Sequence, residues 1–176
     1  MSFLSRCAVA AGFAGACSLT LLLSPALADV SAVVQSWRTD AGWLTELRKH
    51  ADGALVCTTG KAFRDPNTFG LSIVQSGPTM LITLVDEASP PSTGGPMRFS
   101  AGPQELGALA SMTEGPAFAT TEQESGKTRR LISDLPDQLV TIAVADRQYQ
   151  ADLTGLTIAR EQLRVCESEV KAAEAQ

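Results

Sequence analysis

From Val30 onward, short apolar segments alternate with polar turns, and the side chains inside several segments alternate at the two-residue period of β-strands. Val30–Trp37 is apolar and extended, and Trp43–Lys49 alternates apolar and polar side chains. Asp52-Gly53, a dipeptide typical of tight hairpins, separates the second segment from Ala54–Thr59. These segments therefore predict a strand followed by a β-hairpin. A helix over the second segment is the alternative, and the turn dipeptide favours the strand.

Further strands are predicted where apolar runs end at turn residues. Met80–Val85 is almost continuously apolar, which is typical of a strand inside a sheet. Glu87–Pro96 contains three prolines and is predicted to be a loop, and Thr128–Leu135 is predicted to form one or two helical turns. The other predicted strands are Phe69–Gln75, Thr79–Asp86, Met97–Ala101, Ala117–Thr121, Gln138–Val144 and Tyr149–Leu153.

Near the C-terminus the apolar pattern changes to the period of an α-helix. One face of this predicted helix carries Leu156, Ala159, Leu163, Cys166 and Val170. Thr154 precedes it as a candidate N-cap, and residues 171–176 are expected to fray. Many short strands followed by one helix predict a mainly β domain, antiparallel and sandwich-like, with the C-terminal helix packed on the sheet. An α+β fold is the alternative.

The first 28 residues have the three parts of a secretory signal peptide. Arg6 is their only charge, an apolar run follows over Cys7–Leu23, and Ala26-Leu27-Ala28 places small residues at the cleavage site. We therefore expect a single exported domain at residues 29–176, periplasmic or secreted, with no transmembrane segment after cleavage. A retained membrane anchor is the first alternative, although the run is short for one. Lipid attachment at Cys17 is the second, although hydrophobic sequence continues beyond it.

Two cysteines remain once Cys7 and Cys17 leave with the signal peptide. In an oxidising compartment, Cys57 and Cys166 are expected to form a disulfide if geometry allows. The bridge would span 109 positions and join an early strand to the terminal helix. Two separate buried thiols are the alternative.

The charge of the chain argues against nucleic-acid binding. The formal net charge is −5, and it becomes −6 when Arg6 is removed. A nucleic-acid-binding protein needs several clustered basic residues to neutralise phosphates. This acidic chain has one short basic cluster, Lys127-Thr128-Arg129-Arg130. This cluster is expected to be a solvated loop or helix start.

The order of features in the last strand and helix resembles a known family. The pattern Tyr149-x-x-x-Leu153-x-Gly155-x-x-x-Ala159-x-x-x-Leu163-x-x-Cys166 follows an early tryptophan and a cysteine-bearing strand. This order resembles small exported bacterial domains of the invasion-associated locus B type. The resemblance implies a β-sandwich-like domain closed by a strand, a glycine turn and a helix that ends in cysteine. It also implies an exported protein that is sometimes linked to host-cell contact.

The sequence contains no recognisable catalytic or metal-binding motif. His50 is the only histidine, and it stands beside the predicted hairpin turn without a G-x-S-x-G nucleophile motif. H-E-x-x-H, C-x-x-C and D-x-D-x-D-G are not found, so no catalytic residue, metal ligand or cofactor is predicted. The acidic pairs Asp86-Glu87 and Glu122-x-Glu124 are interpreted as solvated turns.

The leading functional hypothesis is therefore a non-enzymatic exported domain that binds another protein. Trp37, Trp43, Arg129 and Arg130 are the candidate partner surface, because tryptophan and arginine are favoured at binding hot spots. Packing in the core is the default interpretation of both tryptophans. The alternatives are an inhibitor or enzyme acting on envelope polymers or proteases, with its site in Glu87–Pro96 or around His50, and a component of a secretion-system assembly.

Export is directly testable. Expression of the full chain in a bacterium with an intact secretion pathway should yield a protein whose N-terminal residue is Asp29, as read by intact-mass spectrometry. Replacing Ala28 with proline should block cleavage and leave the longer chain. A mature chain that begins at a lipid-modified Cys17, or that retains Met1, would contradict the prediction.

Overall fold

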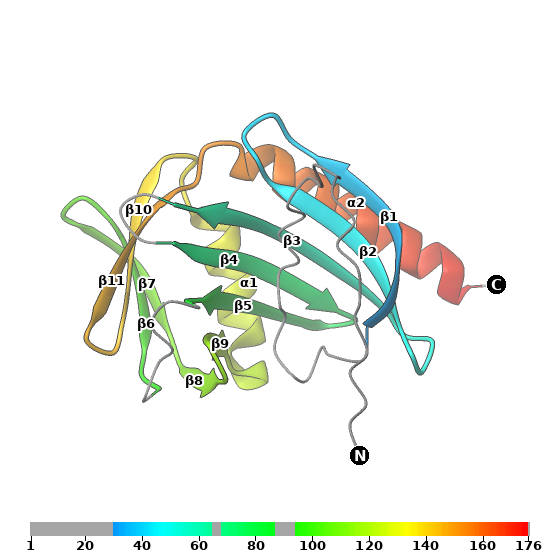
Figure 1. Cartoon of the computed structure of the whole chain (residues 1–176), viewed down its shortest axis with the longest axis horizontal. Coiled ribbons are helices and arrows are strands. Elements are labelled where there is room, and N and C mark those ends of the chain that lie inside the picture. Colours follow the sequence, from blue (N-terminus) through cyan, green and yellow to red (C-terminus); the bar gives the residue numbers. More distant parts are fainter. Residues whose placement is uncertain (1–29, 65–67, 87–93, 176) are drawn as a thin grey trace, which may run out of the picture.

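The computed structural model of the chain describes residues 30–64, 68–86 and 94–175, which form two antiparallel sheets and two α-helices (Figure 1). The predicted signal peptide lies outside the described residues, as do positions 87–93 of the predicted loop. The fold class predicted from the sequence is confirmed: the described chain is mainly antiparallel β, and its C-terminal helix packs on a sheet.

The larger sheet has seven strands in the order β1-β2-β3-β4-β5-β9-β8. The first five strands follow one another in the chain as an antiparallel meander, and β9 and β8 extend the sheet beyond β5. The predicted interior position of β5 is confirmed, since it pairs with β4 on one side and β9 on the other. The strands are β1 (Val30–Arg38), β2 (Leu44–His50), β3 (Leu55–Phe63), β4 (Phe69–Ser76), β5 (Thr79–Val85), β8 (Ser111–Glu114) and β9 (Ala117–Thr120).

The predicted turn between β2 and β3 is confirmed in detail. The His50 N–H donates to the Ala54 carbonyl at 2.8 Å, and the Gly53 N–H donates to the His50 carbonyl at 3.0 Å. Gly53 has a φ of +92°, a conformation that favours glycine. The Asp52 side chain accepts the Ala54 N–H at 2.9 Å. Both turn residues are therefore used for the local chemistry that makes Asp-Gly a hairpin signal.

The smaller sheet has four strands in the order β11-β10-β6-β7. Its strands are β6 (Met97–Ala101), β7 (Gln104–Leu109), β10 (Leu139–Val144) and β11 (Arg147–Asp152). The sequence analysis did not predict β7 and β8. Both are short strands at sheet edges and lack a continuous apolar face, so their β structure depends on pairing with β6 and β9 rather than on a local pattern.

Two helices complete the core on one face of the larger sheet (Figure 1). Helix α1 (Ser125–Asp134) follows a short 3-10 turn (Glu122–Glu124) and contacts β5 and β7, and helix α2 (Leu156–Glu174) contacts β2 and β3. The predicted apolar stripe of α2 is buried along its full length. Residues 171–174, which were expected to fray, belong to α2. The core includes buried side chains from both helices and both sheets.

The predicted N-cap of α2 is wrong. Gly155 occupies this position, with a φ of +87°, and the Thr154 hydroxyl instead bonds to Asp152 Oδ1 at 2.7 Å. A side chain at Gly155 would also collide with its surroundings, because a Cβ built there lies 2.5 Å from the Ala41 Cβ. The turn conformation and the close approach of the β1–β2 connection therefore both require glycine.

Three neighbouring contacts hold the start of α2 against the sheet. Trp43 Nε1 donates to the Thr154 carbonyl at 3.0 Å, and the tryptophan side chain is fully buried. Lys61 Nζ donates to the carbonyls of Asp152 at 2.8 Å and Thr154 at 3.3 Å. The ammonium also lies 5.9 Å from the centre of the Trp43 ring, within the range of a cation–π contact.

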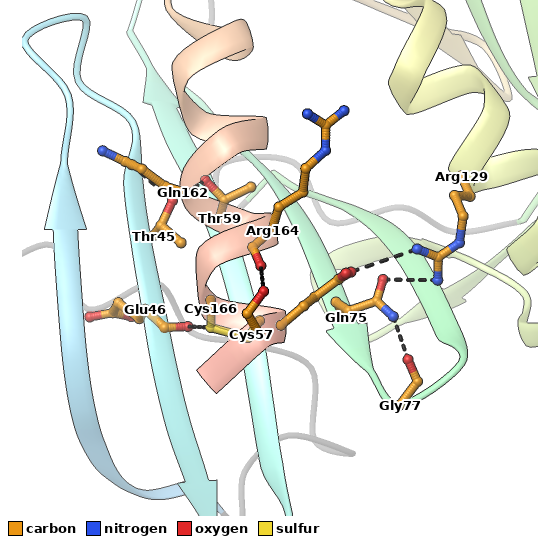
Figure 2. Close-up of a disulfide and its surroundings, with 12 residues drawn as sticks. Thr45, Glu46, Cys57, Thr59, Gln75, Gly77, Arg129, Gln162, Arg164 and Cys166 are labelled. Carbon is orange, nitrogen blue, oxygen red and sulfur yellow. Dashed lines mark hydrogen bonds and ion pairs between the residues drawn. A yellow bond between two sulfur atoms is a disulfide. The ribbon is translucent and has the colours of Figure 1, made fainter. Parts of the chain in front are cut away.

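The disulfide predicted between Cys57 and Cys166 is present. It joins β3 to the second half of α2, and both residues are buried, so it fastens the helix to the sheet from within the core (Figure 2). The bridge closes a loop of 109 residues. In the chain-entropy model, a loop of this length stabilises the fold by about 4–5 kcal/mol, a large fraction of the stability of a small domain.

Removing this link should therefore destabilise the domain by several kcal/mol. We expect the variant Cys57→Ala/Cys166→Ala to lose about 4–5 kcal/mol of unfolding free energy relative to the oxidised chain, as measured by urea unfolding. Addition of dithiothreitol should destabilise the wild-type chain by a similar amount and leave the double variant unchanged. A loss below about 1 kcal/mol would contradict a stabilising role for the bridge.

Candidate functional site

A groove lies beside the second half of α2, between the helix, the start of β3, the turn that joins β4 to β5, and α1. Its volume is about 360 Å³, which lies at the lower end of the range for ligand sites. It is lined by Leu55, Cys57, Gln75, Gly77, Pro78, Arg129, Glu167, Val170, Lys171 and Glu174. We call this space the hairpin groove.

Apolar side chains from the sheet and the helix line one part of the hairpin groove. Val170 is the last buried residue of the α2 stripe, and Leu55 at the start of β3 packs partly buried against the core. Cys57 also lines the groove, so the disulfide that positions α2 is part of its wall. The apolar lining is therefore held by the same contacts that hold the helix to the sheet.

A fixed arginine forms the polar wall. Arg129 of α1 donates from one terminal nitrogen to Gln75 Oε1 at 3.2 Å (Figure 2). The same nitrogen donates to the Pro78 carbonyl at 3.3 Å. Its other terminal nitrogen lies 3.6 Å from a carboxylate oxygen of Glu167 in α2. Gln75 is oriented in turn by a hydrogen bond from its amide nitrogen to the Gly77 carbonyl. The guanidinium is thus held by three elements and remains partly exposed to solvent.

A second groove of about 180 Å³ adjoins the first along the boundary between α1 and α2. The two grooves share Arg129 and Glu167 as lining residues. Within the second groove, one terminal nitrogen of Arg160 donates to the carbonyls of Ile132 and Ser133, both at 2.8 Å, at the end of α1. Arg160 therefore has a structural role, since it satisfies carbonyls that the helix end leaves unpaired.

The grooves carry more positive than negative charge, although the chain as a whole is acidic. Their lining includes four basic side chains, Arg129, Arg160, Arg164 and Lys171, and two acidic ones, Glu167 and Glu174. Within the described part of the chain, no carboxylate pairs with Arg164 or Lys171. A negatively charged group entering the grooves would therefore meet cations whose charge is not already neutralised.

The four residues singled out from the sequence do not form one surface. Trp43 is fully buried under the start of α2, so it belongs to the core and not to a partner surface. Trp37 lies half-buried on β1. Arg129 and Arg130 are both on α1, but only Arg129 lines the grooves, while Arg130 is exposed. The helix predicted at this place from the sequence had only one or two turns, too few to show which of the two arginines faces the grooves.

The remaining candidates from the sequence have ordinary surroundings. His50 ends β2 at the hairpin turn. Among residues 30–64, 68–86 and 94–175, no cluster of three potential metal-ligating side chains occurs. In the same residues, neither α-helix is long and apolar enough to span a membrane.

A buried polar cluster lies where the two sheets meet, and it includes Asp86, so the interpretation of this residue as part of a solvated turn is wrong. Asp86, just after β5, accepts hydrogen bonds at one carboxylate oxygen from the Tyr149 hydroxyl at 3.0 Å and from Arg147 at 3.3 Å. Burial is the main cause that raises the pKa of Tyr149, the carboxylate of Asp86 raises it further, and Arg147 opposes the shift. Since each group has a partner, this cluster fastens β11 to β5.

Comparison with known proteins leaves the family open: the chain matches no protein-family model, and no characterised protein or solved structure is significantly similar to it. The resemblance to the invasion-associated locus B type stays a prediction.

The titration of Tyr149 can be followed without interference, because it is the only tyrosine. The ultraviolet absorbance of the phenolate should appear at higher pH in the folded chain than in denaturant, where the pKa returns to about 10. Because the folded-state pKa is the higher one, the unfolding free energy should fall as the pH rises above about 10. Replacing Asp86 with asparagine should lower the folded-state pKa. Identical titrations of folded and unfolded chains would contradict the prediction.

Proposed function

We propose that this chain is an exported, non-enzymatic domain that binds another protein through the hairpin groove. The observation that carries the proposal is the position of Arg129, a partly exposed guanidinium fixed by Gln75, Pro78 and Glu167 beside an apolar lining. Arginine is enriched among the residues that dominate binding energies. An arginine already held in place loses little side-chain entropy when a partner binds.

The size and chemistry of the groove favour a short protein segment as its occupant. About 360 Å³ is enough for one or two side chains, and Leu55 and Val170 provide the apolar contact they need. Lys171 lines the hairpin groove and Arg164 lines the adjoining second groove, and both cations favour a carboxylate next to the apolar side chain. The proposed ligand is therefore a segment that combines an apolar side chain with an acidic one.

The predicted export and the family resemblance support the same class of function. A signal peptide at 1–28 would place the domain outside the cytoplasm, where a disulfide between Cys57 and Cys166 is stable. Proteins of the invasion-associated locus B type are exported and sometimes linked to host-cell contact. A domain that binds a protein of the envelope or of a host cell is consistent with both expectations.

Neighbouring arginines on α1 provide a matched test. Peptides selected from a phage-displayed random library against the exported protein should combine apolar and acidic residues. Their affinity, measured by fluorescence anisotropy, should fall at least about tenfold in Arg129→Ala, the effect of a binding hot spot worth more than about 1 kcal/mol. Arg130→Ala removes the same charge from the same helix outside the grooves and should leave the affinity nearly unchanged.

Two outcomes would contradict the proposal: a selection that yields no binding peptide, or equal losses of affinity in the two arginine variants. Val170→Asp provides a second test, since a carboxylate in the apolar lining should repel the acidic ligand. Circular dichroism of each variant should match the wild-type spectrum, so that a loss of binding is not confused with unfolding.

A further inference from the structure

The second groove, at the boundary between α1 and α2, has an apolar inner wall. Met80 of β5, Ile132 of α1 and Leu163 of α2 line it, and all three side chains are buried. They belong to the hydrophobic core that the two helices share with the larger sheet. An apolar group that enters the groove therefore gains free energy by leaving water at this wall.

Three arginines line the same groove and make it positively charged. Arg129 comes from α1, and Arg160 and Arg164 come from α2. Arg160 and Arg164 are four residues apart, a spacing at which like charges on one helix repel each other. Among the described residues of the lining, Glu167 is the only acidic one. Positive charge is thus concentrated at one place in a chain whose formal net charge is −5.

The guanidinium of Arg164 has no partner within the described residues. Glu167 is three residues further along α2, a spacing that allows an ion pair within the helix. Its carboxylate instead lies 3.6 Å from a terminal nitrogen of Arg129. Figure 2 shows the Arg164 side chain extending away from α2, with no interaction drawn at its guanidinium. All of its N–H groups are therefore available to a ligand.

The other two guanidiniums are held by protein groups and keep donors of their own. Arg129 uses one terminal nitrogen for its bonds to Gln75 and Pro78, and within the described chain its Nε donates no hydrogen bond. One terminal nitrogen of Arg160 donates to carbonyls at the end of α1, the other donates to the Thr157 hydroxyl at 3.0 Å, and the Nε is likewise without an acceptor there. Guanidinium groups pair well with carboxylates because two parallel N–H donors match the two carboxylate oxygens. The groove therefore combines two positioned guanidiniums with one that can adapt to a ligand.

We propose that the second groove binds a small carboxylic acid with a short apolar chain. The carboxylate accepts hydrogen bonds from Arg164 and is stabilised by the charges of Arg129 and Arg160, while the apolar chain packs on the buried inner wall. The groove volume of about 180 Å³ lies below the usual range for ligand pockets, so the ligand has few atoms.

The two kinds of lining select this class of ligand together. Inorganic sulfate or phosphate pairs with arginines but leaves the apolar wall without contact, and a neutral apolar molecule leaves the guanidiniums without an acceptor. This site is independent of the proposed function, because Met80, Ile132 and Arg164 line the second groove and not the hairpin groove.

Nuclear magnetic resonance of isotope-labelled methionine methyl groups tests this site directly. Met80 lines the second groove, whereas Met97 is buried in the smaller sheet and Met112 is exposed on β8. When the exported chain is titrated with isovalerate at constant ionic strength, the Met80 signal should shift and saturate with a dissociation constant of about 10 mM or lower. The Met97 and Met112 signals should stay in place, since neither residue lines this groove.

Two variants and two other ligands show which groups bind the acid. Arg164→Ala should weaken isovalerate binding at least about fivefold, because its charge-assisted hydrogen bonds are lost. Arg130→Ala removes the same charge from an exposed position outside both grooves and should leave the affinity unchanged. Isovaleramide, which has the same shape without the charge, and sodium sulfate, which has no apolar chain, should both bind much more weakly. The Met97 signal of each variant should match the wild type, which shows that the core is retained.

Three results would overturn the inference: no shift of the Met80 signal up to about 50 mM isovalerate, an equal response to isovaleramide or sulfate, or equal weakening in the two arginine variants. A failed peptide selection together with a saturating Met80 shift would contradict the proposed function alone. Peptide binding without a Met80 response to isovalerate would contradict this inference alone, so the two failures are distinguishable.

Discussion

The disulfide between Cys57 and Cys166 is the contact on which the rest of the structure depends. A curved sheet can bury its inner face only if something stays packed against it, and α2 supplies that cover over β2 and β3. The covalent link fixes the helix at its second half within the core. Val170 lies one turn further along the helix, so the bridge also determines where the apolar lining of the hairpin groove stands relative to β3.

The beginning of α2 is held by a different kind of contact. Gly155 allows the chain to turn closely against the β1–β2 connection. Just before this turn, Trp43 donates to the Thr154 carbonyl and Lys61 donates to the Asp152 carbonyl. With both ends of α2 positioned, Glu167 is presented to Arg129 of α1 at a defined place. The groove is therefore a consequence of how the helix is anchored, and Arg129 is held in it by Gln75, Pro78 and Glu167.

Helix α2 separates two surfaces with different chemistry. The flank toward α1 carries Arg160, Arg164 and Glu167 and borders the grooves. The flank toward β1 carries Ile158 and Val165, two apolar side chains that are each about half exposed. The two flanks of one helix therefore differ in chemistry, with charged side chains toward α1 and apolar ones toward β1.

Local pattern and redox chemistry determined much of this fold from the sequence alone. The Asp52-Gly53 hairpin and the buried α2 stripe follow from periods of two and 3.6 residues, and pairing of the two remaining cysteines follows from the predicted compartment. Only the tertiary structure separated Arg129 from Arg130 and revealed β7 and β8. The reason is that each of these features depends on what lies opposite in space, and a linear pattern contains no information about such neighbours until the sheet has formed.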